Sequence, residues 1–251
     1  MSSFFTSFPT IGYKFGSESS VSAFHDLAVY VDIISSLKDQ TTAYEYFNIK
    51  DNDRPDNISN LLYGTPHYYW TFYILNDGLK RSGWPLPYLD LQELIKKRYP
   101  NRTIVLRKIL KDDFAVGMNV YGVTSASGGV IIARNLELGQ IVVKPTNNKT
   151  FIAGEVLQSN VGLDGLADGS GQPVTNHNIH STTLEYLSAH HYEDTSGNYV
   201  DIDPVNGPGA SLVEVTYQER MRKKNDSLRR MKFFKPHIVT EIVKKFEDVL
   251  K

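Results

Sequence analysis

Hydrophobic side chains recur every three or four residues between residues 23 and 38 of the chain. This spacing places them on one face of an amphipathic helix. The next apolar run, at residues 44–49, is aromatic and β-prone, and it therefore predicts a strand. The apolar positions of the expected helix are Leu27, Val31, Ile34 and Leu37.

Residues 51–77 predict two short helices separated by a tight turn. Pro55 and Asp56 suit the start of the first helix, because proline is tolerated in a first turn and an acid favours its positive end. Gly64 is expected to end it, because glycine readily adopts the left-handed conformation of a helix C-terminus. Thr65 is expected to cap the second helix, which has a proline at its first position.

Each of these helices carries an apolar stripe. On the second helix, Tyr68 and Trp70 are expected to point away from that stripe, and residues 76–78 are expected to end the helix. Asp90 is expected to cap a third helix. The stripes consist of Ile58, Leu61 and Leu62 on the first helix, Tyr69, Phe72 and Tyr73 on the second, and Leu91, Leu94 and Ile95 on the third.

From residue 103 onward, glycine and β-branched residues dominate, in short runs separated by turn-forming pairs. This texture predicts a small antiparallel barrel or sandwich. Residues 164–178 are expected to form a mobile, glycine-rich loop, and residues 186–192 and 198–202 a hairpin. The apolar runs lie at residues 130–132, 140–143 and 151–157.

The C-terminal part returns to helical spacing. Residues 214–230 predict a basic and polar helix, and residues 232–236 interrupt it. A last helix at residues 237–250 has a broad apolar face, which must dock on its own domain or on a partner. That face consists of Ile238, Ile242, Phe246, Val249 and Leu250.

Together these patterns predict an α+β fold in four segments. Residues 1–22 form an extended N-terminal arm, which orders against a neighbour or packs on its own domain. Residues 23–102 hold the first helix and the strand-helix-helix module. Residues 103–210 form the antiparallel β-rich domain, and residues 211–251 form a C-terminal helical segment.

Composition narrows the classes of function. The chain has 251 residues, 41% apolar and 22% charged, which is ordinary for a protein that packs a core. Its net charge of -1 gives no general attraction to nucleic acid or to an anionic membrane. No run approaches the ~20 apolar residues of a membrane helix. Without cysteine there are no disulfides or thiolate metal sites, and without a visible export signal we expect the protein to stay where it is made.

Motifs for catalysis or nucleotide binding are missing from the sequence, which has no Walker loop, G-x-S-x-G or H-E-x-x-H. Two histidine pairs, His177 with His180 and His190 with His191, could in principle hold a metal. However, adjacent residues in a strand point to opposite faces of the sheet, so we expect surface histidines and no metal or other cofactor.

Charged residues give no sharper hypothesis. Glu155, Glu185 and Asp194 could be chosen only arbitrarily as the two placed acids that a glycosidase needs. The basic run at residues 220–235 alternates with acidic residues, which favours a solvated or protein-binding helix face over nucleic-acid binding.

The order of strand, helix, glycine turn and helix ending in asparagine resembles a LysM-like module. A longer string is more specific. RPDNISNLLYGTPHYYW at residues 54–70, followed by ILND at residues 74–77, resembles the baseplate wedge family of contractile-tailed, T-even-like bacteriophages. The LysM-like framework positions are Asp53, Ile58, Leu61, Tyr63, Gly64, Trp70 and Asn76.

The resemblance to the wedge family extends to about half of the chain. Residues 112–208 match less well, and we interpret them as an inserted β-domain particular to this lineage. The other matching stretches are the helix at residues 27–37, the strand at 46–50, the patterns at 219–225 and 228–232, and the final helix.

This resemblance implies a non-enzymatic structural protein of the virion, located in the tail baseplate and made in the host cytoplasm. The protein would join a wedge after the wedge heterotrimer and the sheath-initiating protein. It would then bind neighbouring wedges and help to close them into a ring around the tail hub. Six copies per baseplate would follow from that ring. The LysM-like part would bind protein rather than glycan.

Two other hypotheses stay open at this point. The LysM-like segment is also compatible with a cell-wall (peptidoglycan) binding module of a phage tail or lysis protein, and the basic run with a nucleic-acid accessory protein.

The sequence offers three candidate protein-binding surfaces: an aromatic arm, a Tyr- and Trp-bearing module, and a terminal amphipathic helix. Aromatic residues make up 12% of the chain, and tyrosine serves both cores and interfaces. The candidate interface residues are Phe4, Phe5, Phe8, Tyr63, His67, Tyr68, Trp70, Asn76, Asp77, Trp84, Arg229, Arg230, Phe233, Phe234 and Phe246.

Overall fold

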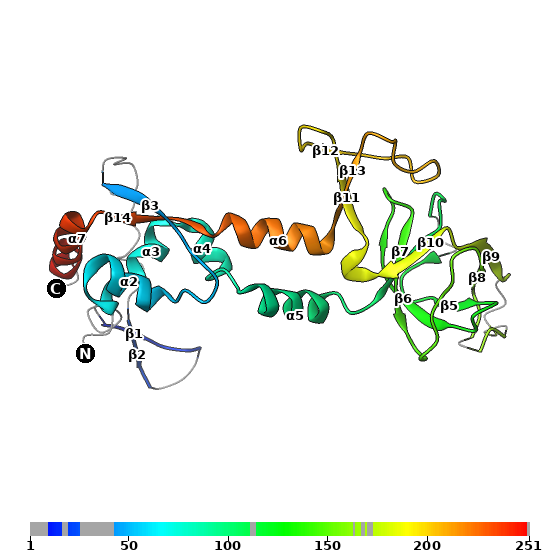
Figure 1. Ribbon diagram of the computed structural model, residues 1–251. Helices are drawn as coiled ribbons and strands as arrows, with labels where there is room; N and C mark the ends of the chain where they lie inside the picture. The colour runs from blue at the N-terminus through cyan, green and yellow to red at the C-terminus, as the bar shows by residue number, and fades with distance from the viewer. Residues whose placement is uncertain are drawn as a thin grey trace. The chain divides into compact units, whose positions relative to one another are not determined.

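The computed structural model divides the chain into two compact units (Figure 1). Unit 1 combines Met1–Tyr88 with Lys224–Lys251, and unit 2 is Leu89–Lys223, so unit 2 is inserted into unit 1 along the chain. Helices and several antiparallel sheets together form the predicted α+β fold. The structure describes residues 10–16, 20–25, 43–110, 114–162, 164–166, 169 and 173–249.

Unit 1 is built on a two-stranded antiparallel sheet of β3 (Tyr44–Asn48) and β14 (Arg230–Phe234). The strand predicted at residues 44–49 is thus confirmed. The interruption between helices predicted at residues 232–236 is present, but the partner strand β14 occupies most of it, which the sequence did not predict. The reason is tertiary, because both Phe233 and Phe234 are buried, on opposite faces of β14.

The first predicted helix of the module is confirmed, and the second is confirmed at its two ends but is not continuous. The first begins at Pro55 and ends at Gly64, whose φ of 70° is left-handed. The second is capped by Thr65 and ends at Asn76 as predicted, but it is divided into a 3-10 turn and a short α-helix, and a further helix begins directly after Asn76. The elements are α2 (Pro55–Tyr63), the 3-10 turn η2 (Pro66–Tyr68), α3 (Trp70–Leu75) and α4 (Asp77–Ser82).

The buried stripes of these helices also differ from the prediction. On α2, Ile58 is buried as expected, whereas Leu61 is 73% exposed. On α3, Trp70 is only 8% exposed and Tyr69, just before the helix, is 40% exposed, which reverses their expected roles. The 3-10 turn explains this reversal, because it has three residues per turn and rotates the positions that follow it.

The last helix, α7 (Pro236–Val249), docks on unit 1 itself. It buries Val239 and Val243 against Trp70 and Phe234, while Ile238 is half-buried at the edge of the same cluster. Val239 and Val243 thus extend the predicted apolar face, of which Ile238 is part of the cluster. The side chains of Ile242, Phe246 and Val249, and all of Leu250, lie outside the described residues.

The N-terminal part contains a hairpin of β1 (Thr10–Tyr13) and β2 (Ser22–His25), paired antiparallel from Thr10 with His25 to Tyr13 with Ser22. Residues 23–25 are therefore in a strand, where a helix was predicted to begin. The rest of that predicted helix, residues 26–38, lies outside the described residues.

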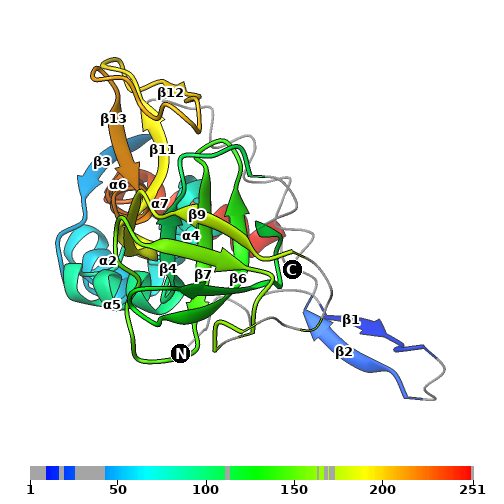
Figure 2. The ribbon, with the colours of Figure 1, turned by 90° about the vertical axis from the view of Figure 1, so that its right-hand side faces the viewer.

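Unit 2 contains a seven-stranded antiparallel sheet with the order β10-β4-β7-β6-β5-β8-β9 (Figure 2). Its first and last strands in this order, β10 and β9, are separated by only Ile179 and His180 along the chain. The two ends of the sheet must therefore lie within about 11 Å of each other, which favours the barrel over the sandwich. The strands are β4 (Arg102–Val105), β5 (Asn119–Gly122), β6 (Gly128–Asn135), β7 (Gln140–Pro145), β8 (Val156–Ser159), β9 (Thr175–Asn178) and β10 (Ser181–Leu184).

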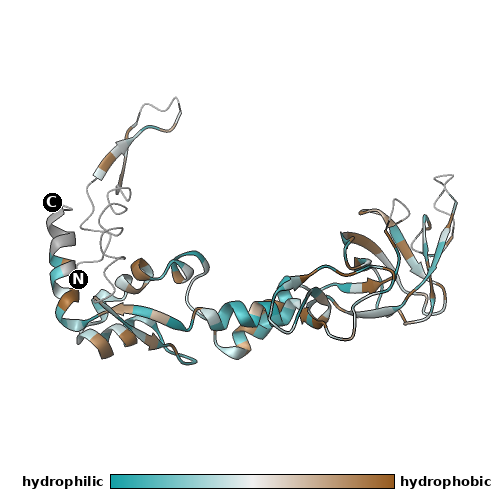
Figure 3. Cartoon of the chain, turned by 90° about the horizontal axis from the view of Figure 1, so that it is seen from above, coloured by the Kyte–Doolittle hydropathy of each residue, from teal (hydrophilic) through white to brown (hydrophobic). Residues whose placement is uncertain are grey.

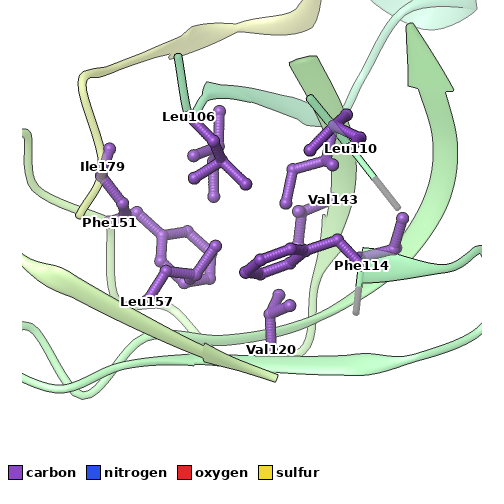
Figure 4. Close-up of a cluster of buried hydrophobic side chains, with 11 residues drawn as sticks. Leu106, Leu110, Phe114, Val120, Val143, Phe151, Leu157 and Ile179 are labelled. Atoms are coloured by element: carbon purple, nitrogen blue, oxygen red, sulfur yellow. The ribbon is translucent and has the colours of Figure 1, made fainter. Parts of the chain in front are cut away.

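A hydrophobic core fills the curled sheet (Figure 4). Phe114 and Phe151 both belong to this core, although neither lies in a strand. The run at residues 151–157 is consequently a strand only from Val156, and the expected loop at 164–178 ends in β9. The cluster consists of Ile104, Leu106, Leu110, Phe114, Val120, Ile131, Ile141, Val143, Phe151, Leu157 and Ile179.

A second sheet of unit 2 places β11 (Ala189–Glu193) between β12 (Tyr199–Val200) and β13 (Val213–Thr216). The pairing of β11 with β12 confirms the predicted hairpin. Residues 213–216 pair with β11, so the helix that was predicted to begin at residue 214 begins at Tyr217 instead.

Two helices connect unit 2 with unit 1 along the chain: α5 (Tyr88–Arg98) and α6 (Tyr217–Ser227). α5 starts before the expected cap at Asp90, and Leu94, expected to be buried, is 40% exposed. Both helices are rich in charged and polar residues, and the helical stretch in the middle of Figure 3 is largely hydrophilic. None of the helices in the described part of the chain is long and apolar enough to cross a bilayer.

Candidate functional site

The candidate site is built on one module of unit 1, which we call the bracket. The bracket consists of β3, residues 55–82 and β14. Side chains from α2, α3 and α4 pack on one face of the β3–β14 sheet, and α7 covers part of the other. The sheet is therefore held between two cores. One core contains Ile49, Ile58, Phe72, Leu79, Met231 and Phe233, and the other Ala43, Trp70, Ile74, Leu75, Phe234, Val239 and Val243.

Two side chains of the bracket bind the outer edge of β14. The amide of Asn76 donates from Nδ2 to the carbonyl oxygen of Lys232 at 2.7 Å and accepts from its backbone N–H at 2.8 Å. The hydroxyl of Tyr63 donates to the carbonyl oxygen of Phe234 at 3.1 Å. Burial raises the pKa of Tyr63 above its usual value of 10.0, so the hydroxyl stays protonated and can donate.

A third set of contacts fixes the segment after α4. The indole Nε1 of Trp84 donates to the carbonyl oxygen of Asp53 at 2.7 Å. Asn225 binds both backbone groups of Leu86, at 2.8 and 3.0 Å. Arg229 donates to the Leu86 carbonyl oxygen at 3.1 Å, and it is also paired with the carboxylate of Asp51 at 2.5 Å. Trp84, Asn225 and Arg229 thus join segments far apart in sequence.

Several predicted interface residues lie inside the bracket or in the segment that follows α4. Trp70, Phe233 and Phe234 are buried in its two cores. Tyr63 and Trp84 are half-buried, and each is held by the hydrogen bond described above. Within unit 1, these side chains therefore contribute to the stability of the bracket rather than to an exposed binding surface.

Other predicted interface residues are accessible. His67, Asp77 and Arg230 are exposed, and Tyr68 is half-buried next to the Trp70 core. The exposed side chains of Leu61 and Tyr69 add apolar surface to α2 and to the turn before α3. Neither of these two was selected as an interface residue from the sequence.

The arm contributes aromatic surface as well. Phe4, Phe5 and Phe8 lie outside the described residues, as does the side chain of Phe246. In the hairpin that follows, the ring of Phe15 packs edge-on against Tyr13 at 5.0 Å and against Phe24 at 5.6 Å between centroids. All of these three side chains are largely exposed.

The carboxylates weighed as catalytic acids are engaged in structural contacts. Glu155 is buried and accepts from the backbone N–H groups of Thr124, Ser125 and Ile152 at 3.1, 2.8 and 2.6 Å. Glu185 accepts from the backbone and side chain of Asn101 at 3.1 and 2.7 Å. Asp194 accepts from backbone N–H groups in the turn after β11. Each carboxylate therefore fixes a loop.

The adjacent histidines correct an expectation about their geometry. His190 and His191 were expected on opposite faces of a strand, but their Nδ1 atoms are 2.9 Å apart. The pairing of β11 with β13 shifts register between Ala189 and His191, so a bulge breaks the alternation. His191 also pairs with Glu193 at 3.1 Å. Among the described residues, no group of three or more potential ligands is placed to hold a metal.

Unit 2 also contains a cavity of about 210 Å³ beside β11 and β13. Its polar lining includes Arg107, Tyr192 and Glu214. The Nε of Arg107 is buried and has no hydrogen-bond partner among the described residues. The hydroxyl of Tyr192 lies 3.5 Å from the carboxylate of Glu214.

Sequence reasoning missed Tyr46, Lys232 and Asn225. The alternation of Tyr44 and Tyr46 in a predicted strand could have placed both on one face. Nothing local, however, indicated that residues 230–234 would pair with that strand. Asn225 lies in a helix that was interpreted only by its charge pattern.

No protein-family model matches the chain, and no curated protein matches its sequence.

Proposed function

We propose that the protein is a structural component of a phage tail baseplate wedge. It binds other wedge proteins and helps to join neighbouring wedges into the ring around the tail hub, and it carries out no catalysis. The observation that carries this proposal is the bracket, whose string at residues 54–77 resembles the wedge family and whose exposed apolar residues lie on a firmly held framework.

The LysM-like character of the bracket is part of the proposal. The order of strand, helix, helix and strand is met by β3, α2, α3 with α4, and β14 when unit 2 is treated as an insertion between α4 and β14. In this proposal, residues 112–208 form a lineage-specific domain within that insertion.

A protein that joins neighbouring wedges into a ring needs several separate surfaces and a framework that does not deform when one of them is engaged. Unit 1 offers the exposed pair Leu61 and Tyr69 on the bracket and an aromatic cluster on the hairpin. The partners in this proposal are the wedge heterotrimer, the sheath-initiating protein and the neighbouring wedge.

The test is ring assembly with the purified wedge proteins of the phage that encodes the chain. We expect the double variant Leu61→Glu with Tyr69→Glu to fold but to give few closed rings, because two charges then replace apolar contacts. The matched control is Leu89→Glu with Leu94→Glu on α5. Leu89 and Leu94 are 73% and 40% exposed, the same values as Leu61 and Tyr69.

Rings counted by negative-stain electron microscopy give the readout. Normal ring yield with the bracket variant, or equal loss with the control, would contradict the role of this surface. If the protein instead sedimented with peptidoglycan or chitin fragments and was missing from assembled tails, the alternative of a cell-wall-binding module would replace the proposal.

A further inference from the structure

The outer edge of β3 can be identified from the hydrogen bonds at the two ends of the β3–β14 pair. Ile49 donates to the carbonyl oxygen of Arg229 at 2.8 Å, and Lys235 donates to that of Ala43 at 3.0 Å. In an antiparallel pair, directly bonded residues alternate with residues whose N–H and C=O groups point away from the partner. On β3 the outward groups therefore belong to Tyr44, Tyr46 and Asn48.

The two outer edges of this sheet are treated differently. On β14, the outward groups of Lys232 are bound by Asn76, and the outward carbonyl of Phe234 is bound by Tyr63. On β3, no strand other than β14 pairs with it within the described residues, and no hydrogen bond to its outward backbone groups is found there. One edge is closed by side chains, and the other is open.

Two cationic side chains of β14 lie over tyrosine rings of β3, next to this open edge. The guanidinium carbon of Arg230 lies 4.3 Å from the ring centroid of Tyr46, and the Nζ of Lys232 lies 4.5 Å from that of Tyr44. The cross-strand partners of Arg230 and Lys232 are Asn48 and Tyr46, so each cation reaches diagonally onto β3. Neither is paired with a carboxylate in the part of the chain that the structure describes.

We propose that this surface, which we call the β3 edge (Tyr44, Tyr46, Asn48, Arg230 and Lys232), binds an extended acidic segment of a partner protein as a third strand. The segment exchanges backbone hydrogen bonds with Tyr44, Tyr46 and Asn48. Its side chains alternate between the two faces, so acidic residues at every second position lie on the face of the cations. The recognition signal is therefore an alternating acidic strand.

Charge decides against a second copy of the chain as the occupant. Two copies joined edge to edge through β3 would carry their Arg230 and Lys232 side chains on the same face of a shared sheet. Because each cation lies over a tyrosine ring of its own β3, these like charges would gather above the two adjoining β3 strands and repel each other. An acidic strand instead compensates both cations. The acidic character of the partner strand follows from the β3 edge alone, whether or not the protein belongs to a tail baseplate.

The test uses the full chain and two fluorescein-labelled peptides, Thr-Glu-Val-Glu-Val-Glu-Thr and its counterpart with Lys in place of Glu. We expect the Glu peptide to bind more tightly, as measured by fluorescence anisotropy. In the variant Arg230→Glu with Lys232→Glu, the Glu peptide should bind about tenfold more weakly, because two attractions become repulsions. The Lys peptide should gain affinity, which a merely misfolded variant would not show.

The matched control for this charge reversal is Lys96→Glu with Lys97→Glu on the exposed side of α5, which changes the net charge equally. It should bind both peptides like the unaltered chain.

Hydrogen exchange then locates the bound strand. The Glu peptide should slow exchange at the amides of Tyr44, Tyr46 and Asn48 and leave Glu45 and Phe47, which already face β14, unchanged. Equal binding of the two peptides, binding of neither, or binding without this alternating protection would overturn the proposal. So would a stable dimer of the chain that protects the same three amides.

Discussion

The side chain of Asn76 pairs with the backbone of Lys232 as a neighbouring strand would. Its Nδ2 donates to the Lys232 carbonyl oxygen at 2.7 Å, and its Oδ1 accepts from the Lys232 N–H at 2.8 Å. Nδ2 also donates to the carbonyl oxygen of Phe72 at 2.8 Å, at the end of α3. One amide thus closes the edge of β14 and ends a helix, 156 residues apart in sequence.

Replacement of Asn76 should therefore destabilise unit 1. We expect Asn76→Ala to lower the free energy of unfolding by about 2–3 kcal/mol, because half-buried backbone groups of Lys232 lose their partners. Denaturation followed by tryptophan fluorescence measures this directly, since both tryptophans, Trp70 and Trp84, lie in unit 1. The control Asn57→Ala, at an exposed position of α2, should change stability by less than about 1 kcal/mol.

Tyr63 predicts a loss of stability at alkaline pH. Burial raises its folded pKa above the ordinary value of 10.0, so the unfolded chain ionises first. The stability that this difference contributes is complete below about pH 10 and is lost as pH rises further. We expect Tyr63→Phe to lose about 1 kcal/mol at neutral pH with its hydrogen bond to Phe234, and to show a shallower decline in alkali. Parallel alkaline slopes for the two proteins would refute this assignment.

Local patterns predicted the elements of unit 1 well where local chemistry decides them. Proline at the start of α2 and glycine after its end act within one turn of chain, and both bounds agree with the structure. The strand at β3 was found for the same reason. By contrast, β14 was missed because its pairing with β3 joins residues that are far apart in sequence. Pairing of this kind is decided by tertiary contacts and leaves no local signal.

The candidate site was harder to predict than the elements. Trp70 was given an outward position by counting along one continuous helix, but the 3-10 turn before it rotates its side chain into the core. The bulge at His190 likewise breaks the alternation of side chains between the two faces of the strand. The β3 edge needed the partner strand before it could be recognised. Local spacing therefore identified several of the residues that contribute to the site. It was less reliable in predicting whether their side chains are exposed.

Glu155 is expected to be essential for the stability of unit 2. The buried carboxylate accepts hydrogen bonds from three backbone N–H groups and from the hydroxyl of Ser125 at 2.9 Å. These bonds replace the ones that it would make with water. Glu155→Gln should cost about 3 kcal/mol, because the amide presents N–H groups to these donors. Hydrogen exchange of the unit 2 amides measures the loss, and Glu93→Gln, at an exposed position of α5, is the control.

Gly122 offers an independent test of the same carboxylate. A Cβ at this position would lie 2.7 Å from Oε1 of Glu155 and 2.6 Å from Oγ of Ser125. We expect Gly122→Ala to destabilise unit 2 by about 1–3 kcal/mol through overpacking. The double variant with Glu155→Gln should lose less than the sum of the two single losses, because both changes disturb one cluster. Additive losses would mean that the two residues act separately.

The histidine pair of unit 2 predicts a loss of stability in acid. Burial, with Arg220 and His191 nearby, lowers the folded pKa of His190 below its usual value of 6.5. The unfolded chain then takes up the proton first, so stability is complete above about pH 6.5 and falls as the pH drops further. His190→Phe keeps a ring against Tyr217, 5.0 Å away, and removes the titration. Hydrogen exchange of the β11 amides at pH 7 and pH 5 should therefore differ less in this variant than in the unaltered chain. An equal difference in both would show that another group, such as the Glu193 carboxylate paired with His191 and Lys223, governs the response.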